Sequence, residues 1–192
     1  MANLILTNFC NANCEFCFAA DFRRRTAKKW MSDREYFSWL WFLQKAGITE
    51  IRLLGGEPTL HPLFADFVKK SRTLGMSILV FTNGMVGNEE LDVLSSLEPE
   101  VCKVVVNINA ARFDDEHEQV LTTLKRLGNR VVPGITLTSP NFSLEEPVSA
   151  IETYGLCRSI RLGISHPTWL GNNRSLHPKR YTAVGQTLYE QS

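Results

Sequence analysis

The sequence contains no apolar run near the roughly 20 residues that a membrane-spanning helix requires. Its N-terminus also lacks the basic start, long apolar segment and small-residue cleavage site of a secretory signal. Neither sign of charge is in large excess, because 21 Lys and Arg face 20 Asp and Glu, for a net charge of +1. We therefore expect a cytoplasmic globular protein that binds neither membranes nor nucleic acid.

The cysteine content does not fit a disulfide framework. There are five cysteines, an odd number, and three of them lie within eight positions. A cytoplasmic protein also keeps its thiols reduced. Cys102 and Cys157 fall in or beside predicted strands and are interpreted as small buried apolar residues. Cys10, Cys14 and Cys17 are instead interpreted as metal ligands.

The spacing Cys10-x-x-x-Cys14-x-x-Cys17 favours an iron–sulfur cluster. A short loop lets each of three thiolates reach a different iron of one cubane. Because a four-iron cluster needs four ligands, three cysteines leave one iron open to bind an outside molecule. The alternative is a non-catalytic module with structural zinc, held by the three cysteines and by His61 or His166. Structural zinc usually uses two paired Cys-x-x-Cys elements, whereas this loop offers one triplet.

Short apolar segments alternate with amphipathic ones along nearly the whole chain, which is typical of repeated β-strand and α-helix units. Strands are expected at 4–6, 51–54, 78–81, 101–108, 131–137 and 160–164. Helices are expected at 36–46, 62–74, 89–97, 117–127, after Ser143 and at 178–188, with capping boxes at 32–35 and 143–146 and a cap at Asn88. Continuously apolar strands imply a parallel sheet covered by helices. A partial barrel and a doubly wound open sheet both satisfy this pattern.

Polar or glycine-rich segments follow directly after the predicted strands. In parallel folds of both kinds, reactive groups collect where the strands end, at their carboxyl side. The sequence therefore predicts one site along this rim, built from the cysteine loop and from segments 55–58, 82–84, 107–109 and 165–166.

At this point a family resemblance is clear. The run Cys-Asn-Ala-Asn-Cys-Glu-Phe-Cys at 10–17 resembles the Cys-x-x-x-Cys-x-aromatic-Cys signature of the radical S-adenosylmethionine (SAM) superfamily. Segment 55–58 is similar to that family's Gly-Gly-Glu-Pro motif, and Thr-Asn-Gly at 82–84 matches a further common element. The resemblance covers essentially the whole chain and implies an enzyme with an incomplete (β/α)6 barrel.

The resemblance also implies a reaction. Cys10, Cys14 and Cys17 would ligate a 4Fe–4S cluster whose open iron chelates the amino and carboxylate groups of SAM. An electron from the reduced cluster, supplied by a donor such as flavodoxin or ferredoxin, would cleave SAM into methionine and a 5′-deoxyadenosyl radical. That radical would abstract hydrogen from a substrate. Phe16, in the aromatic slot, would pack near the adenine, or else simply anchor the loop.

Further SAM-binding residues are implied by the resemblance. Gly55 and Gly56 would let the backbone approach the methionine moiety, and Glu57 or nearby carbonyls would accept from its ammonium. The other interpretation of the glycines is a tight turn before a helix. Polar ribose contacts fall at the end of the fourth strand in related enzymes, where serine and aspartate are frequent. Asn107 and Asn109 stand at this place in the chain, and Asn83 is a further candidate for the cofactor pocket.

Several features of the sequence are not explained by these motifs. The basic run Arg23–Arg25 with Lys28 and Lys29 is interpreted as a solvated loop, with an acidic substrate, a peptide or a reductase as the alternative partner. The first long helix is rich in aromatic residues and is expected to be buried, or to dock a missing domain or partner. His61 and His117 are expected in local capping or surface roles, and His166 is a candidate for substrate contact.

We therefore expect one radical SAM core domain over residues 1–192, truncated before a C-terminal extension or minimal in form, because no closing element follows the last helix. The segment 55–60, the Asn-x-Asn of strand four and Asn141 are similar to the core of SPASM-type members. Those mostly modify peptides or proteins and carry auxiliary clusters, whose cysteines this chain lacks. A small-molecule radical enzyme and an activase that installs a glycyl radical are the alternatives.

Overall fold

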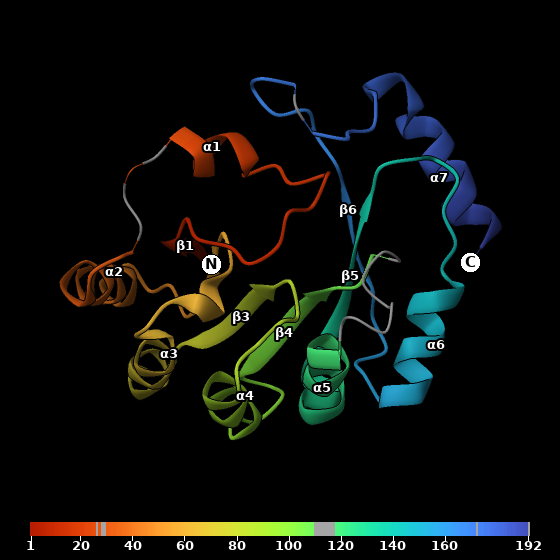
Figure 1. The fold of residues 1–192 in the computed structure, drawn as a ribbon. Coiled ribbons are helices and arrows are strands. Elements are labelled where there is room, and N and C mark those ends of the chain that lie inside the picture. The colour runs from red at the N-terminus through yellow and green to blue at the C-terminus, as the bar shows by residue number, and fades with distance from the viewer. Residues whose placement is uncertain (26, 28–29, 110–117, 172, 192) are drawn as a thin grey trace.

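The fold is built on one sheet of six parallel strands, in the order β1-β2-β3-β4-β5-β6. The computed structural model describes all residues except 26, 28–29, 110–117, 172 and 192. Each strand pairs with the next along the chain, so β1 and β6 form the two edges. This confirms the predicted partial (β/α)6 barrel over the open doubly wound sheet (Figure 1). The strands are β1 Ala2–Thr7, β2 Glu50–Gly55, β3 Ser77–Thr82, β4 Cys102–Asn107, β5 Val131–Leu137 and β6 Arg161–Ile164.

Helices connect successive strands and cover the outer face of the sheet, as Figure 1 shows for α2 to α5. Side chains alternate between the two faces of a strand. Leu4 and Leu6 of β1, and Ile51 and Leu53 of β2, therefore point to the helices and belong to the buried core. The helices are α1 Ala20–Arg25, α2 Asp33–Lys45, α3 Phe64–Thr73, α4 Asn88–Ser95, α5 Glu118–Leu127, α6 Glu145–Tyr154 and α7 Tyr181–Glu190, with 3-10 turns η1 Pro58–Leu60, η4 Gly128–Arg130 and η5 Pro178–Arg180.

The predicted helix caps are partly confirmed. Ser32 and Glu35 form the expected capping box at the start of α2. Asn88 is not a cap, because Gly87 occupies the N-cap position and the Asn88 side chain accepts from Arg126 at 3.2 Å. The predicted box at 143–146 is also absent. There Leu144 occupies the N-cap position, and the Ser143 hydroxyl accepts from the Glu145 amide instead of the Glu146 amide that a capping box would use.

Two predictions about the first helices need correction. Arg23–Arg25 of the basic run, expected in a solvated loop, lie in the short helix α1 Ala20–Arg25. Helix α2 buries only the stripe of Tyr36, Leu40 and Leu43. Its other aromatic side chains, Phe37, Trp39, Trp41 and Phe42, are each about half exposed, so the expected burial holds for one face alone. Within the described residues, no helix has the length and apolar character of a membrane span.

Candidate functional site

The cysteine loop leaves the end of β1 and leads into α1 across the rim of the sheet (Figure 1). All three cysteines are partly exposed. The amide of Cys17 donates to the Cys14 carbonyl at 3.1 Å, and that of Ala20 donates to the Cys17 carbonyl at 3.3 Å. These turns fold the triplet into a compact loop. Within the described residues, no group of three or more His, Cys, Asp or Glu side chains lies close enough together to hold one metal ion.

The Gly55–Gly56 pair packs against the backbone that leads into the cysteine loop. The Gly56 amide donates to the Thr7 carbonyl at 2.8 Å, and the Glu57 amide donates to the Phe9 carbonyl at 2.6 Å. A Cβ on Gly55 would lie 2.3 Å from the Thr7 carbonyl oxygen, and one on Gly56 only 2.0 Å from that of Phe9. Both positions therefore require glycine because two chain segments touch there. The sequence motif alone did not reveal this contact.

The Glu57 carboxylate is buried beneath the rim, with 1% of the residue exposed. Its Oε1 accepts from the Thr59 hydroxyl and the Thr82 hydroxyl, both at 2.8 Å, and from the Thr59 amide. Its Oε2 accepts from the Asn83 amide at 2.7 Å. Burial raises the pKa of Glu57, while these four donors oppose the rise. Both oxygens of the carboxylate thus accept from donors within the protein.

Asn83 connects the turn after β3 to the cysteine loop. Its Oδ1 accepts from the Met85 amide at 2.8 Å, which orients the side chain. Its Nδ2 donates to Asn11 Oδ1 at 2.6 Å and lies 3.8 Å from Cys10 Sγ. The Cys10 sulfur also accepts from the Ala12 amide at 3.4 Å. Three predicted motifs therefore meet around Glu57, Asn83 and Cys10.

Arg23 is a site residue that the sequence interpretation missed. It extends from α1 back over the cysteine loop and donates to the carbonyls of Cys10 and Ala12, each at 3.4 Å. Burial raises the pKa of Cys10, whereas the Ala12 amide and the positive charge of Arg23 lower it. The run of arginines after the triplet was the only available signal. Lys28 and Lys29 of the same basic run lie outside the described residues.

Asn107 and Asn109 lie farther along the rim and contact β5. Asn107 Nδ2 donates to the Thr136 hydroxyl at 3.2 Å. The Asn109 amide group pairs with the Thr136 backbone in both directions, at 2.8 and 3.0 Å. The structure thus brings these two asparagines together with Thr136, and their described contacts do not include the cysteine loop.

The segment after β6 closes over the cysteine loop. The Phe16 carbonyl accepts from Ser165 at 3.4 Å and from Asn173 at 3.5 Å. The Arg174 amide donates to the Glu15 carbonyl at 2.7 Å, and the amide of Leu170 donates to the carboxylate of Asp21 at 2.8 Å. The loops that follow the two edge strands therefore meet at the rim.

The histidines considered for a structural zinc site lie in different surroundings. His61 is buried, its Nε2 lies 2.9 Å from the Met31 carbonyl, and its Nδ1 accepts from the Leu63 amide at 3.0 Å. Both ring nitrogens are thereby used inside the protein. His166 is exposed at the rim beside Tyr181, and His117 lies outside the described residues.

The two remaining cysteines differ from each other. Cys102 is fully buried in β4, as expected, and burial raises the pKa of its thiol to about 11. Cys157 is only partly buried and contacts Ser159 at 3.2 Å, so the prediction of burial is not met there.

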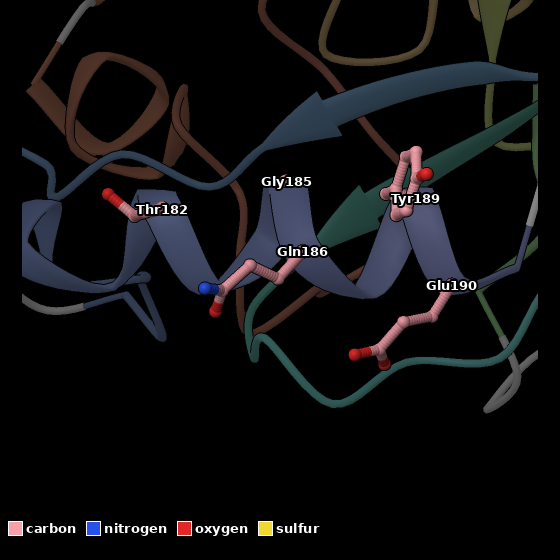
Figure 2. A pocket seen from close by; sticks show the side chains of 5 residues that line it. All are labelled: Thr182, Gly185, Gln186, Tyr189 and Glu190. Carbon is pink, nitrogen blue, oxygen red and sulfur yellow. The ribbon is translucent and has the colours of Figure 1, made fainter.

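A hollow on α7 contains none of the predicted site residues. Figure 2 shows the side chains that line it, all of them on α7. It is lined by Thr182, Gly185, Gln186, Tyr189 and Glu190. We therefore place the candidate site at the rim.

The fold and the rim define a class of protein: a partial parallel barrel whose cysteine triplet follows its first strand. The family model of the radical SAM superfamily matches residues 4–133. The chain belongs to this superfamily, as its motifs predict, and is a radical SAM enzyme by family. Family membership implies SAM and an iron–sulfur cluster as cofactors and an electron donor as partner.

Among characterised proteins, the chain is similar to the sporulation killing factor maturation protein SkfB of Bacillus subtilis (strain 168). The two are 30% identical over 162 residues, covering 77% of this chain and 37% of SkfB. It is also 32% identical over 126 residues to the GTP 3′,8-cyclase of Synechocystis sp. (strain ATCC 27184 / PCC 6803 / Kazusa), covering 63% of this chain and 38% of that enzyme. The chain thus spans less than half the length of both relatives.

Solved structures agree on the fold. The crystal structure of Streptococcus suis SuiB bound to S-adenosylmethionine aligns with a TM-score of 0.73 at 12% identity, covering 98% of this chain and 46% of SuiB. The crystal structure of methylornithine synthase (PylB) aligns with a TM-score of 0.66 at 15% identity, covering 99% of this chain and 63% of that one.

The residues at the rim fit the cofactors that the family implies. Three thiols come from one loop, and the Cys10 sulfur already lies among N–H donors. A cluster held by three thiolates carries negative charge, which Arg23 would offset. Both donors and charge match the chemistry of an iron–sulfur ligand set.

Proposed function

We propose that this chain cleaves SAM reductively at a 4Fe–4S cluster held by Cys10, Cys14 and Cys17. The observation that carries the proposal is the hydrogen-bonded connection of Glu57, Asn83 and Cys10, which joins the ends of the first three strands. This connection gives the cysteine loop a fixed place on the rim before any cofactor binds. Three cysteine ligands would leave one iron of the cluster without a protein ligand, and SAM would bind there.

The chemistry that a bound cluster would supply is an electron for SAM, which would give methionine and a 5′-deoxyadenosyl radical able to take hydrogen from the substrate. The protein orients these groups and excludes water. Phe16 packs near the adenine, with its backbone held by the loop after β6. The Gly55-Gly56-Glu57 turn borders the methionine moiety through its backbone.

The three asparagines serve different parts of the pocket in this proposal. Asn83 faces the cluster side of the cofactor pocket, from its place beside Cys10. Asn107 and Asn109 supply the polar ribose contacts. Their pairing with Thr136 holds them at the carboxyl ends of β4 and β5, where such contacts are needed.

For the substrate, we propose a peptide or protein. SkfB, a maturation protein, is among the relatives. SuiB shares the fold and has been solved with its precursor peptide SuiA. A small-molecule substrate is the second candidate, because the GTP 3′,8-cyclase is similar at 32% identity. A glycyl-radical activase is a further alternative, since a putative activating enzyme from Methanocaldococcus jannaschii is also a relative, at 28% identity.

The remaining parts of the proposal concern context. We propose that residues 1–192 form the radical SAM core of a cytoplasmic enzyme, and that flavodoxin or ferredoxin supplies the electron. The chain spans 37% of SkfB, which leaves room for a further domain such as the auxiliary-cluster extension of SPASM-type members.

Production of 5′-deoxyadenosine tests the reaction. The protein is reconstituted anaerobically with iron and sulfide, reduced with dithionite and given SAM. We expect 5′-deoxyadenosine from the wild type and from Cys157→Ala, whose cysteine lies outside the triplet. Cys14→Ala should release none. Equal release by Cys14→Ala would refute the ligand assignment, and a colourless, zinc-loaded wild type would refute the cluster.

A further inference from the structure

We infer that Asn83 donates a hydrogen bond to the Cys10 sulfur and thereby raises the reduction potential of the cluster, with Glu57 as its positioning residue. The inference rests on the proposed function, and it assigns to one asparagine a task that cofactor binding alone does not require. It also explains why a buried carboxylate lies beneath the cysteine loop.

The direction of the Asn83 side chain follows from its partners. Oxygen and nitrogen of a side-chain amide are distinguished by their hydrogen bonds. The Met85 amide is a donor and lies 2.8 Å from Oδ1, so this atom must be the carbonyl oxygen. The NH2 group consequently faces the cysteine loop. One of its hydrogens is directed to Asn11 Oδ1 at 2.6 Å, and the other is available to Cys10 Sγ at 3.8 Å.

The backbone of Asn83 is held from below by Glu57. The carboxylate accepts from the Asn83 amide at 2.7 Å and from the neighbouring Thr82 hydroxyl at 2.8 Å. The Thr82 hydroxyl oxygen in turn accepts from the Gly84 amide at 3.0 Å. The turn at 82–84 is therefore fixed by the buried Glu57 carboxylate. The backbone of Asn83 cannot move away from Cys10 without breaking these bonds.

The consequence for electron transfer is electrostatic. Reduction adds negative charge to a cluster, and this charge spreads onto the cysteine sulfurs. An N–H donor that points at a sulfur stabilises the added charge, so the potential rises. The Ala12 amide, 3.4 Å from Cys10 Sγ, acts in the same direction. Asn83 differs from Ala12 because its donor is a side chain and can be exchanged by mutation.

Two variants and a distant control separate this role from a structural one. Asn83→Ala removes the donor. Asn83→Asp keeps an acceptor for the Met85 amide, and therefore the turn, but replaces the donor by a carboxylate oxygen facing sulfur. Asn129→Asp adds the same charge on the exposed η4 segment that precedes β5, at the opposite end of the strands from the rim.

The measurement is the midpoint potential of the reconstituted cluster, from a redox titration followed by electron paramagnetic resonance (EPR). We expect a lower potential in Asn83→Ala, a still lower one in Asn83→Asp, and the wild-type value in Asn129→Asp. Iron and sulfide contents report assembly separately. A wild-type potential in Asn83→Ala, with full iron content, would overturn the inference while the proposed function stands. A wild type that assembles no cluster would overturn both.

A measurement on the wild type does not depend on the stability of any variant. Protein grown with asparagine carrying 15N in its side chain is reconstituted and reduced. We expect a hyperfine coupling between this nitrogen and the cluster in pulsed EPR. Labelled Asn11→Ala, which lacks the neighbouring amide, should keep the coupling. A reduced wild-type cluster without 15N coupling would contradict the hydrogen bond.

Discussion

The two halves of the rim are held together in different ways. After β1, β2 and β3, the loops are joined by buried hydrogen bonds around Glu57, which is 1% exposed. After β4, β5 and β6, the contacts are partly exposed side-chain amides, such as Asn109 on Thr136 and Asn173 on Phe16. The first half is therefore fixed by a buried carboxyl group and its hydrogen bonds, and the second by bonds that water can replace.

This difference separates two tasks. The first half would hold the cluster and the methionine part of SAM, and this task needs one fixed backbone geometry for the three cysteines. It is also the half in which all three family motifs lie, although the family match over residues 4–133 continues beyond it through β4. In the proposed function, the second half contributes Asn107 and Asn109, which contact the ribose. Replacements in the first half should therefore cost more than those in the second.

The largest effect is expected for Gly56→Ala. The new Cβ would lie 2.0 Å from the Phe9 carbonyl oxygen, so the backbone leading into the cysteine loop must move. We expect a loss of about 3 kcal/mol in unfolding free energy and incomplete cluster assembly. Gly185→Ala in α7 is the matched control, because nothing lies within 4 Å of its Cβ. Urea denaturation of the apo proteins measures both, and equal stabilities would contradict the packing argument.

Glu57→Gln should rank second. The replacement keeps the shape but offers an NH2 group to donors that need an acceptor, which costs about 2 kcal/mol for a buried donor left unpaired. Chemical denaturation near neutral pH gives the difference directly. If Glu57→Gln were as stable as the wild type, the hydrogen bonds of the carboxylate would not be what holds the loops after β1, β2 and β3 together.

The same residue makes a prediction about pH. Because burial raises the pKa of Glu57, the folded protein binds this proton more tightly than the unfolded chain does. Its contribution to stability is therefore complete below the ordinary value of 4.5 and is lost as the pH rises through the folded pKa. Glu57→Gln should lack this decline. Unfolding free energies of both proteins, measured from pH 4 upward, check the sign.

Asn109→Ala tests the second half. It removes two hydrogen bonds to the Thr136 backbone, and we expect a loss of about 1.5 kcal/mol because water can partly replace them. If Asn109 also contacts ribose, SAM affinity should fall while iron content stays at the wild-type level. Equilibrium dialysis with SAM and iron analysis measure the two separately. Unchanged affinity would remove Asn109 from the pocket.

Asn173→Ala should have the smallest effect. Its amide donates to the carbonyls of Phe16 and His166 near solvent, so about 1 kcal/mol of stability is expected to be lost. Cluster assembly should persist, because the cysteine loop is still held by Asn83 and Arg23. If Asn173→Ala failed to assemble the cluster, the segment after β6 would be as necessary to the cysteine loop as the first half of the rim. The proposed difference between the two halves would then be wrong.

The sequence predicted the fold and the place of the site through local signals. Apolar segments gave the six strands to within a few residues, and polar residues after them gave the rim. What it could not reveal depends on contacts between distant segments. Three hydrogen-bonded contacts of this kind join positions far apart in the chain. Arg23 donates to the Cys10 carbonyl, Thr82 and Asn83 donate to Glu57, and Ser165 donates to the Phe16 carbonyl. The exposure of Trp39 likewise depends on what surrounds the helix.

The open iron is the central claim, and EPR of the reduced cluster tests it most directly. The anaerobically reconstituted protein is reduced with dithionite and measured before and after SAM is added. Binding of SAM to an iron should change the g-values of the cluster signal, and Cys157→Ala should behave in the same way. A reduced cluster with full iron content whose spectrum is identical with and without saturating SAM would contradict the claim.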